Sequence, residues 1–508
     1  MEIWDRLLDN RDTDDGRPVY ERIADAIAAA IDSGDVAPGV RLPTVRELSR
    51  RLNVSSTTVM SVYNRLGEKG MVRGETGRGT FVNPPAQAER HRPLGRAAAQ
   101  SRVPVNRRAW RRRLLAQSES RLQHAFPTAV DLMRGSPDRA LYPLTELKRA
   151  YRAAVGKTTA HDLEYPRHLD LDPVLAEPIL AILDRDEISA TSEQLLVMNS
   201  SQQFLQLFAH MLMDQAGDEP VIAVEEPGYQ TAMDTFEHAG CLLLGVPIDQ
   251  HGMNPAALDD ALNRGASAVL FTPRVQSPTG TSWSSARRRQ LADVLAQHPD
   301  VKIFEDDHFA EASARPGGSL YSDRRLRGRV VYVRSFAKSI APDLRVAVGV
   351  ADPSVRSALN VQKSFADGWT SRIGQRTLGH LLAGDDVFQA MDRTRAAYAE
   401  RRAVMLDALT SRLAGSGVTL PEASDIDGLH VWLTLPVGCS ADQVAEYAAQ
   451  RGFLVAPGEP FYVQPGNESH LRVNAGAAVP DLIREASSAL ADAVERAASS
   501  PVSAVLTP

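Results

Sequence analysis

The order of apolar and polar residues predicts helices near the N-terminus, and alternating strands and helices beyond about Val130. The first helix is predicted from apolar residues that recur every three or four positions, which places them on one face. They are Tyr20, Ile23, Ala24, Ile27 and Ile31. Gly34 and the pair Pro38-Gly39 are expected to end this helix, because both residue types disfavour its continuation.

Two shorter helices are predicted next. Thr44-Val45-Arg46-Glu47 has the form of a capping box, in which the threonine and glutamate side chains bond each other's backbone amides, and it opens a helix through Leu52. The run Ser55-Ser56-Thr57-Thr58 then opens a third helix, which Gly67 and Gly70 end. Its inward-facing residues are expected to be Val59, Val62, Tyr63 and Leu66.

A hairpin completes this N-terminal unit. Met71-Val72-Arg73 and Thr80-Phe81-Val82 have strand character, and the glycine-rich stretch from Gly74 to Gly79 lies between them. Three helices followed by such a hairpin predict a winged helix-turn-helix.

The composition changes after Pro84-Pro85. From residue 86 to about 123 arginine is abundant and acidic residues are few. We interpret residues 85–127 as an Arg-rich linker between an N-terminal domain, residues 1–84, and a large domain, residues 128–500. The linker is expected to be a solvated tether; the alternative is that its arginines add nonspecific phosphate contacts.

The large domain has the pattern of an α/β fold with a mostly parallel sheet. Strands are predicted at Leu195–Val197, Val221–Val224, Ala268–Phe271, Lys302–Phe304 and Val330–Val333. Helices are predicted between them, at Tyr229–His238, Pro255–Asn263 and Ser284–Ala296.

Lys338 follows the last of these strands, at the end where open α/β sheets bind ligands. A lysine near apolar strand ends loses hydration, so its amine loses its proton more easily and can attack an aldehyde to form a Schiff base. Arg345 supplies a cation of the kind that binds phosphate. An aldehyde-binding lysine beside a phosphate-binding arginine indicates pyridoxal phosphate.

Polar residues follow the other strands as well. Asn199-Ser200-Ser201 opens a helix whose N-terminus can hold a phosphate. Tyr229 can stack on a flat heterocycle, and Gln276 and Ser277 lie in a turn that can present polar groups to a ring hydroxyl. Asp306 can pair with a pyridinium nitrogen and keep the ring protonated.

Composition excludes several classes of protein. The 508 residues carry a formal net charge of -6 and are 43% hydrophobic, which shows no overall bias toward nucleic acid or membrane, so any DNA binding must be local. Cys241 and Cys439 lie far apart, so no disulfide framework and no metal site are expected. We find no signal pattern and no membrane-spanning run, and expect a cytoplasmic protein that does not enter a membrane.

The predicted third helix carries local DNA-binding chemistry, because its short hydroxyl side chains can reach phosphates or base edges. These are Ser55, Ser56, Thr57 and Thr58. Arg46, Arg73 and Arg78 supply the electrostatic part, with Arg78 placed on the wing to reach a phosphate or the minor groove. The alternative is a winged helix that mediates only protein contacts.

This N-terminal segment resembles the GntR family of bacterial repressors. The matching motifs are Arg41-Leu42-Pro43-Thr44-Val45-Arg46-Glu47-Leu48, Val54-Ser55-Ser56-Thr57-Thr58-Val59 and Gly77-Arg78-Gly79-Thr80-Phe81-Val82. The resemblance implies double-stranded operator DNA as the partner. Ser56 and Met60 stand where the family often has arginine, so base recognition is expected to differ and phosphate contacts to be fewer.

From about Val130 to Ala498 the chain resembles the fold-type I aminotransferases, which bind pyridoxal phosphate and have a smaller C-terminal α+β subdomain, here about residues 375–500. The resemblance implies that Lys338 forms the Schiff base, Asp306 binds the pyridine nitrogen and Tyr229 stacks on the ring. It implies a phosphate site made of Ser200, Ser201, Ser335 and Arg345.

The same resemblance implies a homodimer in which Tyr165 reaches the cofactor of the neighbouring subunit. Arg472, in Leu471-Arg472-Val473-Asn474, resembles the arginine that binds a substrate carboxylate; the alternative is an exposed strand arginine.

Three positions depart from the aminotransferase pattern. Ser277 replaces the usual asparagine, so the contact to the ring hydroxyl is weaker or passes to Gln276. His308 replaces a common tyrosine and Ser200 a glycine of the phosphate site. These changes affect transamination more than cofactor binding, because the lysine, aspartate and arginine all remain.

A GntR-like winged helix fused to an aminotransferase-like domain is the architecture of the MocR subfamily of bacterial transcriptional regulators, which the chain resembles from end to end. The resemblance implies a DNA-binding regulator that senses pyridoxal phosphate or its adduct with an amino compound. Two alternatives remain open at this point: an active aminotransferase with an accessory DNA-binding domain, and a cofactor-free scaffold that only binds DNA.

Overall fold

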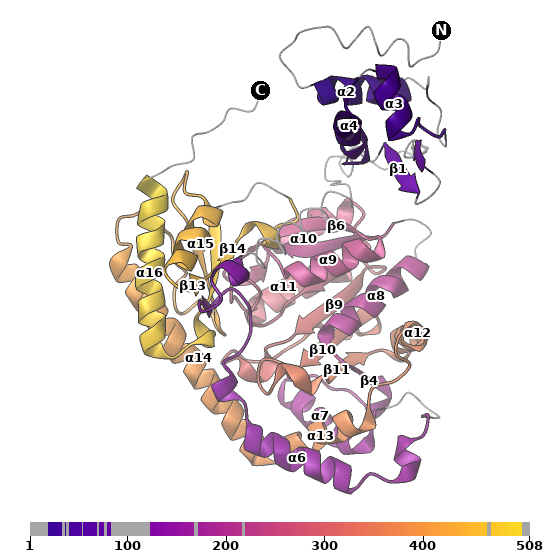
Figure 1. Cartoon of the computed structure of the whole chain (residues 1–508). Helices are drawn as coiled ribbons and strands as arrows, with labels where there is room; N and C mark the ends of the chain where they lie inside the picture. The colour runs from indigo at the N-terminus through magenta and orange to yellow at the C-terminus, as the bar shows by residue number, and fades with distance from the viewer. Residues whose placement is uncertain are drawn as a thin grey trace. The chain divides into compact units, whose positions relative to one another are not determined.

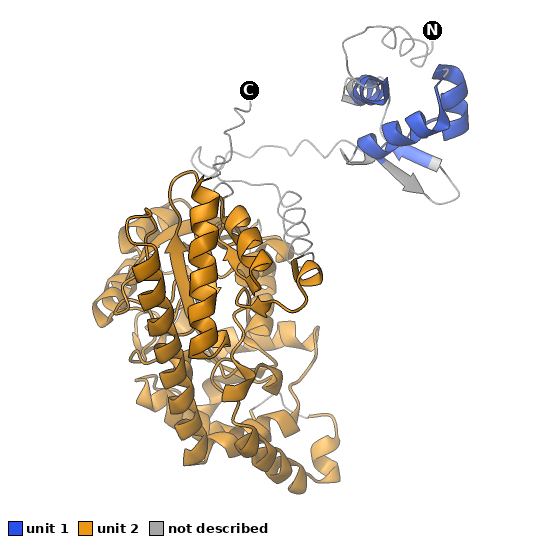
Figure 2. Ribbon diagram, turned by 60° about the vertical axis from the view of Figure 1, so that its left-hand side comes forward, with its two compact units in different colours: residues 1–94 blue, residues 95–508 orange. Residues whose placement is uncertain are grey.

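The computed structural model describes residues 19–32, 36, 40–52, 54–68, 71–75, 79–82, 122–166, 171–215, 219–464 and 469–499. It divides into two compact units, residues 1–94 and residues 95–508 (Figure 2). Each unit is described by itself.

The first unit contains the three predicted helices and the hairpin. The helices are α2 (Val19–Asp32), α3 (Val45–Leu52) and α4 (Ser56–Glu68), and the strands are β1 (Val72–Glu75) and β2 (Gly79–Val82). The predicted capping box at the start of α3 is confirmed: the Thr44 amide donates to Glu47 Oε2 at 2.8 Å and the Glu47 amide to Thr44 Oγ1 at 3.3 Å. The side chains predicted to face inward from α4 are buried, namely Val59, Val62, Tyr63 and Leu66.

The wing has one pairing that the sequence pattern did not predict. β1 and β2 pair antiparallel, and residues 40–42 add to β2, because the Leu42 amide donates to Thr80 O at 2.8 Å and the Val82 amide to Val40 O at 2.9 Å. Some of the predicted features lie outside the described residues. They are the helix-ending residues Gly34, Pro38-Gly39 and Gly70, the wing residue Arg78 and the side chain of Arg73.

The second unit is built on an eight-stranded sheet in the order β4-β11-β10-β9-β8-β5-β6-β7 (Figure 1). The strands are β4 (Leu195–Met198), β5 (Val221–Glu226), β6 (Leu242–Asp249), β7 (Gly252–Met253), β8 (Ala268–Phe271), β9 (Lys302–Asp307), β10 (Val330–Ser335) and β11 (Ala347–Ala351). The pairs β10–β9, β9–β8, β8–β5 and β5–β6 are parallel, while β11 runs antiparallel to both neighbours. The predicted mostly parallel α/β sheet is therefore confirmed.

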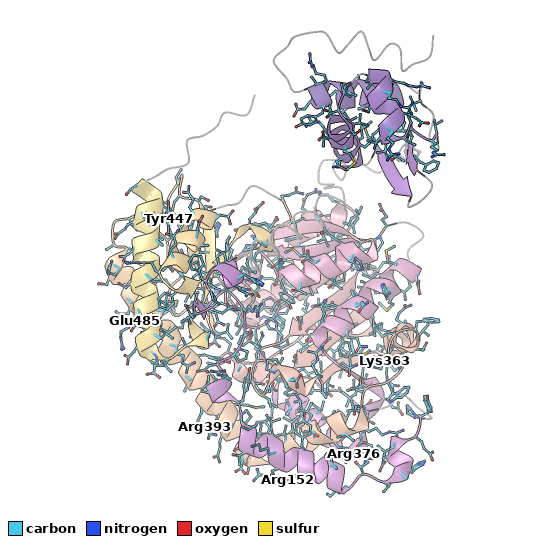
Figure 3. The ribbon with its side chains drawn as sticks, in the orientation of Figure 1. Arg152, Lys363, Arg376, Arg393, Tyr447 and Glu485 are labelled. Carbon is cyan, nitrogen blue, oxygen red and sulfur yellow. The ribbon has the colours of Figure 1, made fainter. Side chains whose placement is uncertain are left out.

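Helices bury both faces of this sheet. One core joins it to α7 (Pro173–Arg185), α10 (Pro255–Asn263), α11 (Ser285–Ala296) and α13 (Arg372–Leu382). The other joins it to α8 (Ser201–Gln215), α9 (Gln230–Ala239) and α12 (Pro353–Ser364). The helix α13 also packs against α6 (Leu144–Gly156) and α7, which belong to the same core. Figure 3 labels Arg376 on α13. Because both faces are covered, these strands are continuous apolar runs.

A smaller α+β subdomain occupies the C-terminal part. It contains α14 (Asp385–Arg412), α15 (Ala441–Gln450) and α16 (Pro480–Ser499) around a three-stranded sheet of β12 (His430–Thr434), β15 (His470–Asn474) and β14 (Ala456–Pro457). In addition, β13 (Phe453–Leu454) pairs with β3 (Val130–Asp131). The first described strand of the second unit, β3, therefore lies in this subdomain and is followed closely by Gly135.

Candidate ligand-binding site

Strand register gathers the predicted phosphate-binding residues at one edge of the large sheet. Ala347 of β11 pairs with Met198 on one side and with Ser335 on the other. This pairing aligns the N-terminus of α8, which follows β4, with the end of β10 and with the loop before β11. Ser200 and Ser201 begin α8, and Arg345 lies two residues before Ala347. The side chain of Arg345 is exposed.

Lys338 lies in the turn after β10, at the same end of the sheet. Its Nζ donates to the backbone oxygen of Gly135. Burial, and then the nearby charge of Arg472, lower the pKa of Lys338 to about 8, although Asp306 opposes the shift. A larger share of neutral amine is therefore present near neutral pH than in an exposed lysine.

Asp306 is the next-to-last residue of β9; it is 3% exposed, and its charge acts on Lys338. Its Oδ1 atom is buried and has no hydrogen-bond partner among the described residues. Burial raises the pKa of Asp306, whereas nearby His308, Ser201 and Lys338 lower it in part. A buried, unpaired carboxylate oxygen next to an amine fits a ligand that brings its own N–H donor.

The ring of His308 lies beside this carboxylate, and the ring of Tyr229 stacks on that of His308. His308 places Nδ1 3.8 Å from Asp306 Oδ2, and its ring lies nearly parallel to that of Tyr229, with the two centroids 6.2 Å apart. Burial lowers the pKa of His308, partly offset by Asp306. Tyr229 stands directly before α9, so its ring is positioned by the end of β5.

The turn after β8 places Gln276 and Ser277 differently. Gln276 is 1% exposed; its Nε2 donates to Pro227 O at 2.8 Å, and its Oε1 accepts from Thr279 Oγ1 at 2.7 Å. These bonds hold the turn together and engage both polar atoms of the Gln276 side chain, while Ser277 beside it is also buried.

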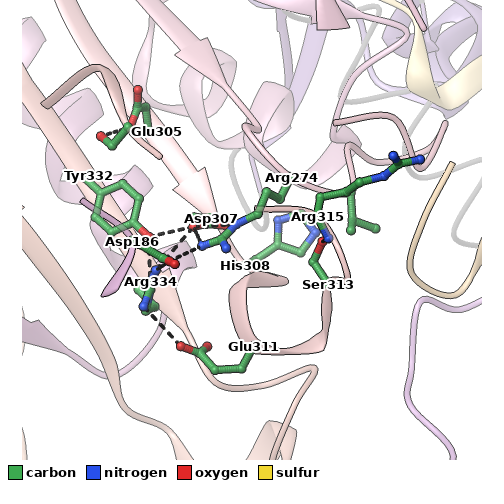
Figure 4. A network of polar contacts seen from close by, with 12 residues as sticks. Asp186, Arg274, Glu305, Asp307, His308, Glu311, Ser313, Arg315, Tyr332 and Arg334 are labelled. Carbon is green, nitrogen blue, oxygen red and sulfur yellow. Dashed lines mark hydrogen bonds and ion pairs between the residues drawn. The ribbon is translucent and has the colours of Figure 1, made fainter. Parts of the chain in front are cut away.

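A buried ion network underlies these strand ends (Figure 4). Arg274 donates through Nε to both oxygens of Asp307, at 3.0 and 3.2 Å, and Tyr332 donates to Asp307 Oδ2 at 2.6 Å. Arg334 donates to Glu311 at 3.1 Å and also bonds Asp186. Burial alone would raise the pKa of Asp307, but Arg274 and Arg334 hold it below its usual value. The network ties together the ends of β8, β9 and β10.

Two residues near Lys338 were not found by sequence reasoning. His430 begins β12, is 3% exposed, and has no hydrogen bond at either ring nitrogen among the described residues. Gly135 lies against it: a Cβ there would be 3.0 Å from His430 Nε2 and 3.7 Å from Lys338 Nζ. One feature of the sequence could have indicated His430. His430 and Trp432 alternate with Val431 and Leu433, and such alternation is typical of a strand with one polar face.

Arg472 is brought into the same place by the neighbouring strand β15. Its Nη2 donates to Met133 O at 2.7 Å, and its guanidinium carbon lies 4.6 Å from the ring centroid of Phe461. The residue is only partly exposed and its charge acts on both Lys338 and His430. This placement favours the prediction that Arg472 contacts a ligand over the alternative that it is an exposed arginine on a strand.

Tyr165 lies apart from this group within the chain. Its side chain is 83% exposed and contacts the ring of Trp369 edge-on, with centroids 5.3 Å apart. Ser335 is buried and accepts a bond from the Ala337 amide at 3.3 Å, and Ser200 accepts one from the Gln203 amide at 3.2 Å, so both hydroxyls also shape their turns.

In the first unit, three of the predicted DNA-binding hydroxyls contact one another, because Ser55 Oγ lies 2.7 Å from both Thr57 Oγ1 and Thr58 Oγ1. Ser55 Oγ also accepts from the Thr58 amide at 3.0 Å, so it caps α4. Ser56 and Thr57 are exposed on the first turn, and Arg46 is exposed on α3.

Both units match known families. Residues 129–490 match the family described as aminotransferase class I and II, and residues 19–82 match the family of bacterial regulatory proteins, gntR. Among solved structures, multiple substrate aminotransferase from Thermococcus profundus superposes with a TM-score of 0.69 at 23% identity, covering 76% of this chain and 95% of the other. Fold and site thus define a regulator-type winged helix joined to an aminotransferase-like domain.

Two curated relatives align with most of this chain. The vitamin B6 salvage pathway transcriptional repressor PtsJ of Salmonella typhimurium is 28% identical over 88% of this chain and 92% of its own length. The probable rhizopine catabolism regulatory protein MocR of Rhizobium meliloti is 28% identical over 82% of this chain and 81% of its own. The chain belongs to the aminotransferase class I and II family and carries a GntR-type helix-turn-helix domain before it, and its homologues include the transcriptional regulators PtsJ and MocR.

None of the helices in the described residues is long and apolar enough to cross a membrane. Within the same residues no group of three or more His, Cys, Asp or Glu side chains is placed to hold a metal ion.

Proposed function

We propose that this chain is a DNA-binding transcriptional regulator, acting in the bacterial cytoplasm, whose second unit binds pyridoxal phosphate and senses it. The observation that carries the proposal is the pairing of Lys338, whose amine is made less basic by burial, with the unpartnered buried oxygen of Asp306. When bound, pyridoxal phosphate supplies an aldehyde for a lysine amine and a ring nitrogen for a carboxylate. The residues present fit both needs.

Each remaining group has a proposed role toward this cofactor. Asp306 accepts a hydrogen bond from the ring nitrogen, and Tyr229 and His308 lie against the ring. Ser277 takes the ring hydroxyl, because Gln276 is engaged in its turn. The phosphate is bound at the aligned sheet edge by Ser200, Ser201, Ser335 and Arg345, helped by the free amides of the α8 N-terminus.

Sensing requires that the ligand bind two conformations unequally. We propose that the cofactor, alone or with an amino compound whose carboxylate contacts Arg472, biases the second unit between conformations that present the tethered DNA-binding units differently. Toward DNA, Ser56, Thr57 and Arg46 make the contacts from α3 and α4, while Arg73 and Arg78 contribute from the wing and Ser55 and Thr58 shape the helix start.

We further propose that the active form is a homodimer. Large apolar side chains are exposed on the segment that carries Tyr165 and on residues 361–369, whose Trp369 contacts Tyr165, and we name this set the aromatic patch: Leu163, Tyr165, Val361, Phe365 and Trp369. Exposed apolar patches of this kind are typical of protein interfaces. A second copy of the chain would cover the patch and bring Tyr165 toward the partner's cofactor.

A second candidate is a working aminotransferase with an accessory DNA-binding unit. It is favoured by the retention of Lys338, Asp306 and Arg472 together, because these are the groups that catalysis would need. Sustained turnover of amino donor with keto acid would support it, whereas an absorbance change with an amine but no turnover supports the sensor.

The test is a visible absorbance spectrum of the purified full-length protein titrated with pyridoxal phosphate. We expect a visible band in the wild type that is absent from Lys338→Ala. A protein without this band would favour a cofactor-free scaffold that only binds DNA, whereas a Lys338→Ala variant that retains the band would show that the aldehyde reacts with an amine other than Lys338. An Asp293→Asn variant, altered at an exposed ion pair with Arg325, is the control and should keep the band.

A further inference from the structure

His430 is a buried polar side chain without a partner in the described part of the chain. It is 3% exposed and neither Nδ1 nor Nε2 makes a hydrogen bond. Nearly all buried polar groups in folded proteins are paired, so an unpaired imidazole indicates a missing partner such as a ligand.

The ring faces the space beside Lys338. The position of a Cβ at Gly135 would lie 3.0 Å from His430 Nε2 and 3.7 Å from Lys338 Nζ. A glycine at this point therefore keeps open a space that borders both the imidazole and the amine. Any side chain there would press on the histidine, since 3.0 Å is shorter than an ordinary carbon–nitrogen contact.

The strands of the small subdomain fix this arrangement. His430 pairs with Asn474 across β12 and β15. Asn474 Nδ2 donates to Arg134 O at 2.6 Å and to Ser136 O at 2.8 Å, so it grips the backbone on either side of Gly135. The imidazole of β12 therefore lies against residues 134–136, which Asn474 of β15 holds in place.

The surroundings of the imidazole favour an anion. The charges of Arg472 and Lys338 both act on it, and together with burial they hold the pKa of His430 well below its usual value. A neutral imidazole still carries one N–H donor. An arginine and an N–H donor that converge beside an amine are the groups that bind a carboxylate.

We propose that His430 is a specificity-determining residue that donates a hydrogen bond to the carboxylate of an amino-acid ligand whose amine lies at Lys338. The residue then selects amino acids over amines that lack a carboxylate. Because Lys338 belongs to the large sheet and His430 to the small subdomain, such a ligand joins the two. The inference rests on the proposed function, in which pyridoxal phosphate is held at Lys338.

The experiment uses full-length protein loaded with pyridoxal phosphate and two probes, L-alanine and isopropylamine. These share an amine-bearing carbon, and a methyl group replaces the carboxylate in the second. The concentration of each probe that gives half of the change in the visible band is measured. The variants are His430→Phe, which keeps a ring without nitrogens, His430→Gln, which keeps an N–H donor, and His298→Phe, an unrelated histidine paired with Asp259.

We expect His430→Phe to weaken the response to L-alanine about 10- to 100-fold, the value of one hydrogen bond to a charged group, and to leave that to isopropylamine unchanged. His430→Gln should recover most of the loss, and His298→Phe should behave as wild type. An unchanged L-alanine response in His430→Phe, an equal loss for both probes, or a wild type that does not prefer L-alanine would overturn the role of His430. A wild type with no visible band would overturn the proposed function as well.

Discussion

At the scale of single residues, the site is built from groups whose burial lowers stability. Lys338 loses hydration, and its amine bonds a backbone oxygen. Asp306 and His430 contain buried atoms that find no partner among the residues that the structure describes. Such groups destabilise a folded chain unless a ligand satisfies them. Their convergence on one space is therefore evidence for a binding site, independent of any resemblance.

The lowered pKa of Lys338 has a consequence for the cofactor-free protein. Between a folded pKa of about 8 and an unfolded value of about 10.4, the unfolded chain binds more protons, so this lysine makes stability rise with pH over that range. Below about pH 8 its buried charge lowers stability. Lys338→Met should then raise the free energy of unfolding at pH 7 by on the order of 2 kcal/mol, less than the full shift because the residue keeps some solvent contact.

Chemical denaturation of both proteins at pH 7 and pH 10 measures this difference. We expect the advantage of the variant to shrink toward pH 10. An advantage that is constant with pH would mean that Lys338 is not desolvated as described.

Asp306 is predicted to bind the cofactor through its charge. Asp306→Asn keeps the size of the side chain but removes the charged acceptor, and a hydrogen bond to a charged group contributes about 1.5–3 kcal/mol. Titration of the visible band should show affinity for pyridoxal phosphate lower by about 10- to 100-fold. Equal affinities in the variant and wild type would remove Asp306 from the site.

At the scale of elements, the strand ends are held by the buried network around Asp307. Asp307→Asn leaves Arg274 and Arg334 without their most buried shared anion, although Asp186 still bonds both, and breaking a buried pair costs up to about 3–5 kcal/mol. Thermal unfolding should show this loss, whereas Asp293→Asn at the exposed pair with Arg325 should cost at most about 1 kcal/mol. Similar losses in both variants would show that the network adds nothing beyond a surface pair.

The capping box of α3 gives a prediction for the DNA-binding unit. Thr44→Ala removes the hydroxyl that accepts the Glu47 amide, which costs about 1 kcal/mol in a typical helix. Proteolysis of the full chain should show faster cleavage within the first unit and no change in the second. Protection equal to that of the wild type would mean that tertiary packing, not the cap, holds this helix.

The direction in which the side chains of an element face decides whether the element could be predicted from the sequence. The parallel strands β4, β5, β8, β9 and β10 are apolar on both faces, so their runs were evident, and α4 was evident from its buried stripe. The strands β12 and β15 were not predicted, because His430, Arg472 and Asn474 face the site and interrupt their apolar pattern. The same orientation explains why Lys338 and Asp306 could be predicted from strand ends and His430 could not.

At the scale of the whole molecule, the aromatic patch tests the proposed dimer. Phe365→Asp places a charge where a partner would pack, and the patch would then be covered only at the cost of burying that charge. Sedimentation of the full chain should change from dimer to monomer. Val437→Asp, at a fully exposed apolar residue outside the patch, should remain dimeric; a dimeric Phe365→Asp would place the interface elsewhere.

The central claim is that the state of the site at Lys338 alters DNA binding. The direct measurement is the affinity of full-length protein for a duplex selected from random DNA, with and without pyridoxal phosphate, in wild type and Lys338→Ala. We predict that the cofactor changes the affinity of the wild type by about 5- to 150-fold, the usual range of coupling between sites, and leaves that of the variant unchanged. Equal affinities under both conditions, in a wild type whose visible band proves that the cofactor is bound, would contradict the account.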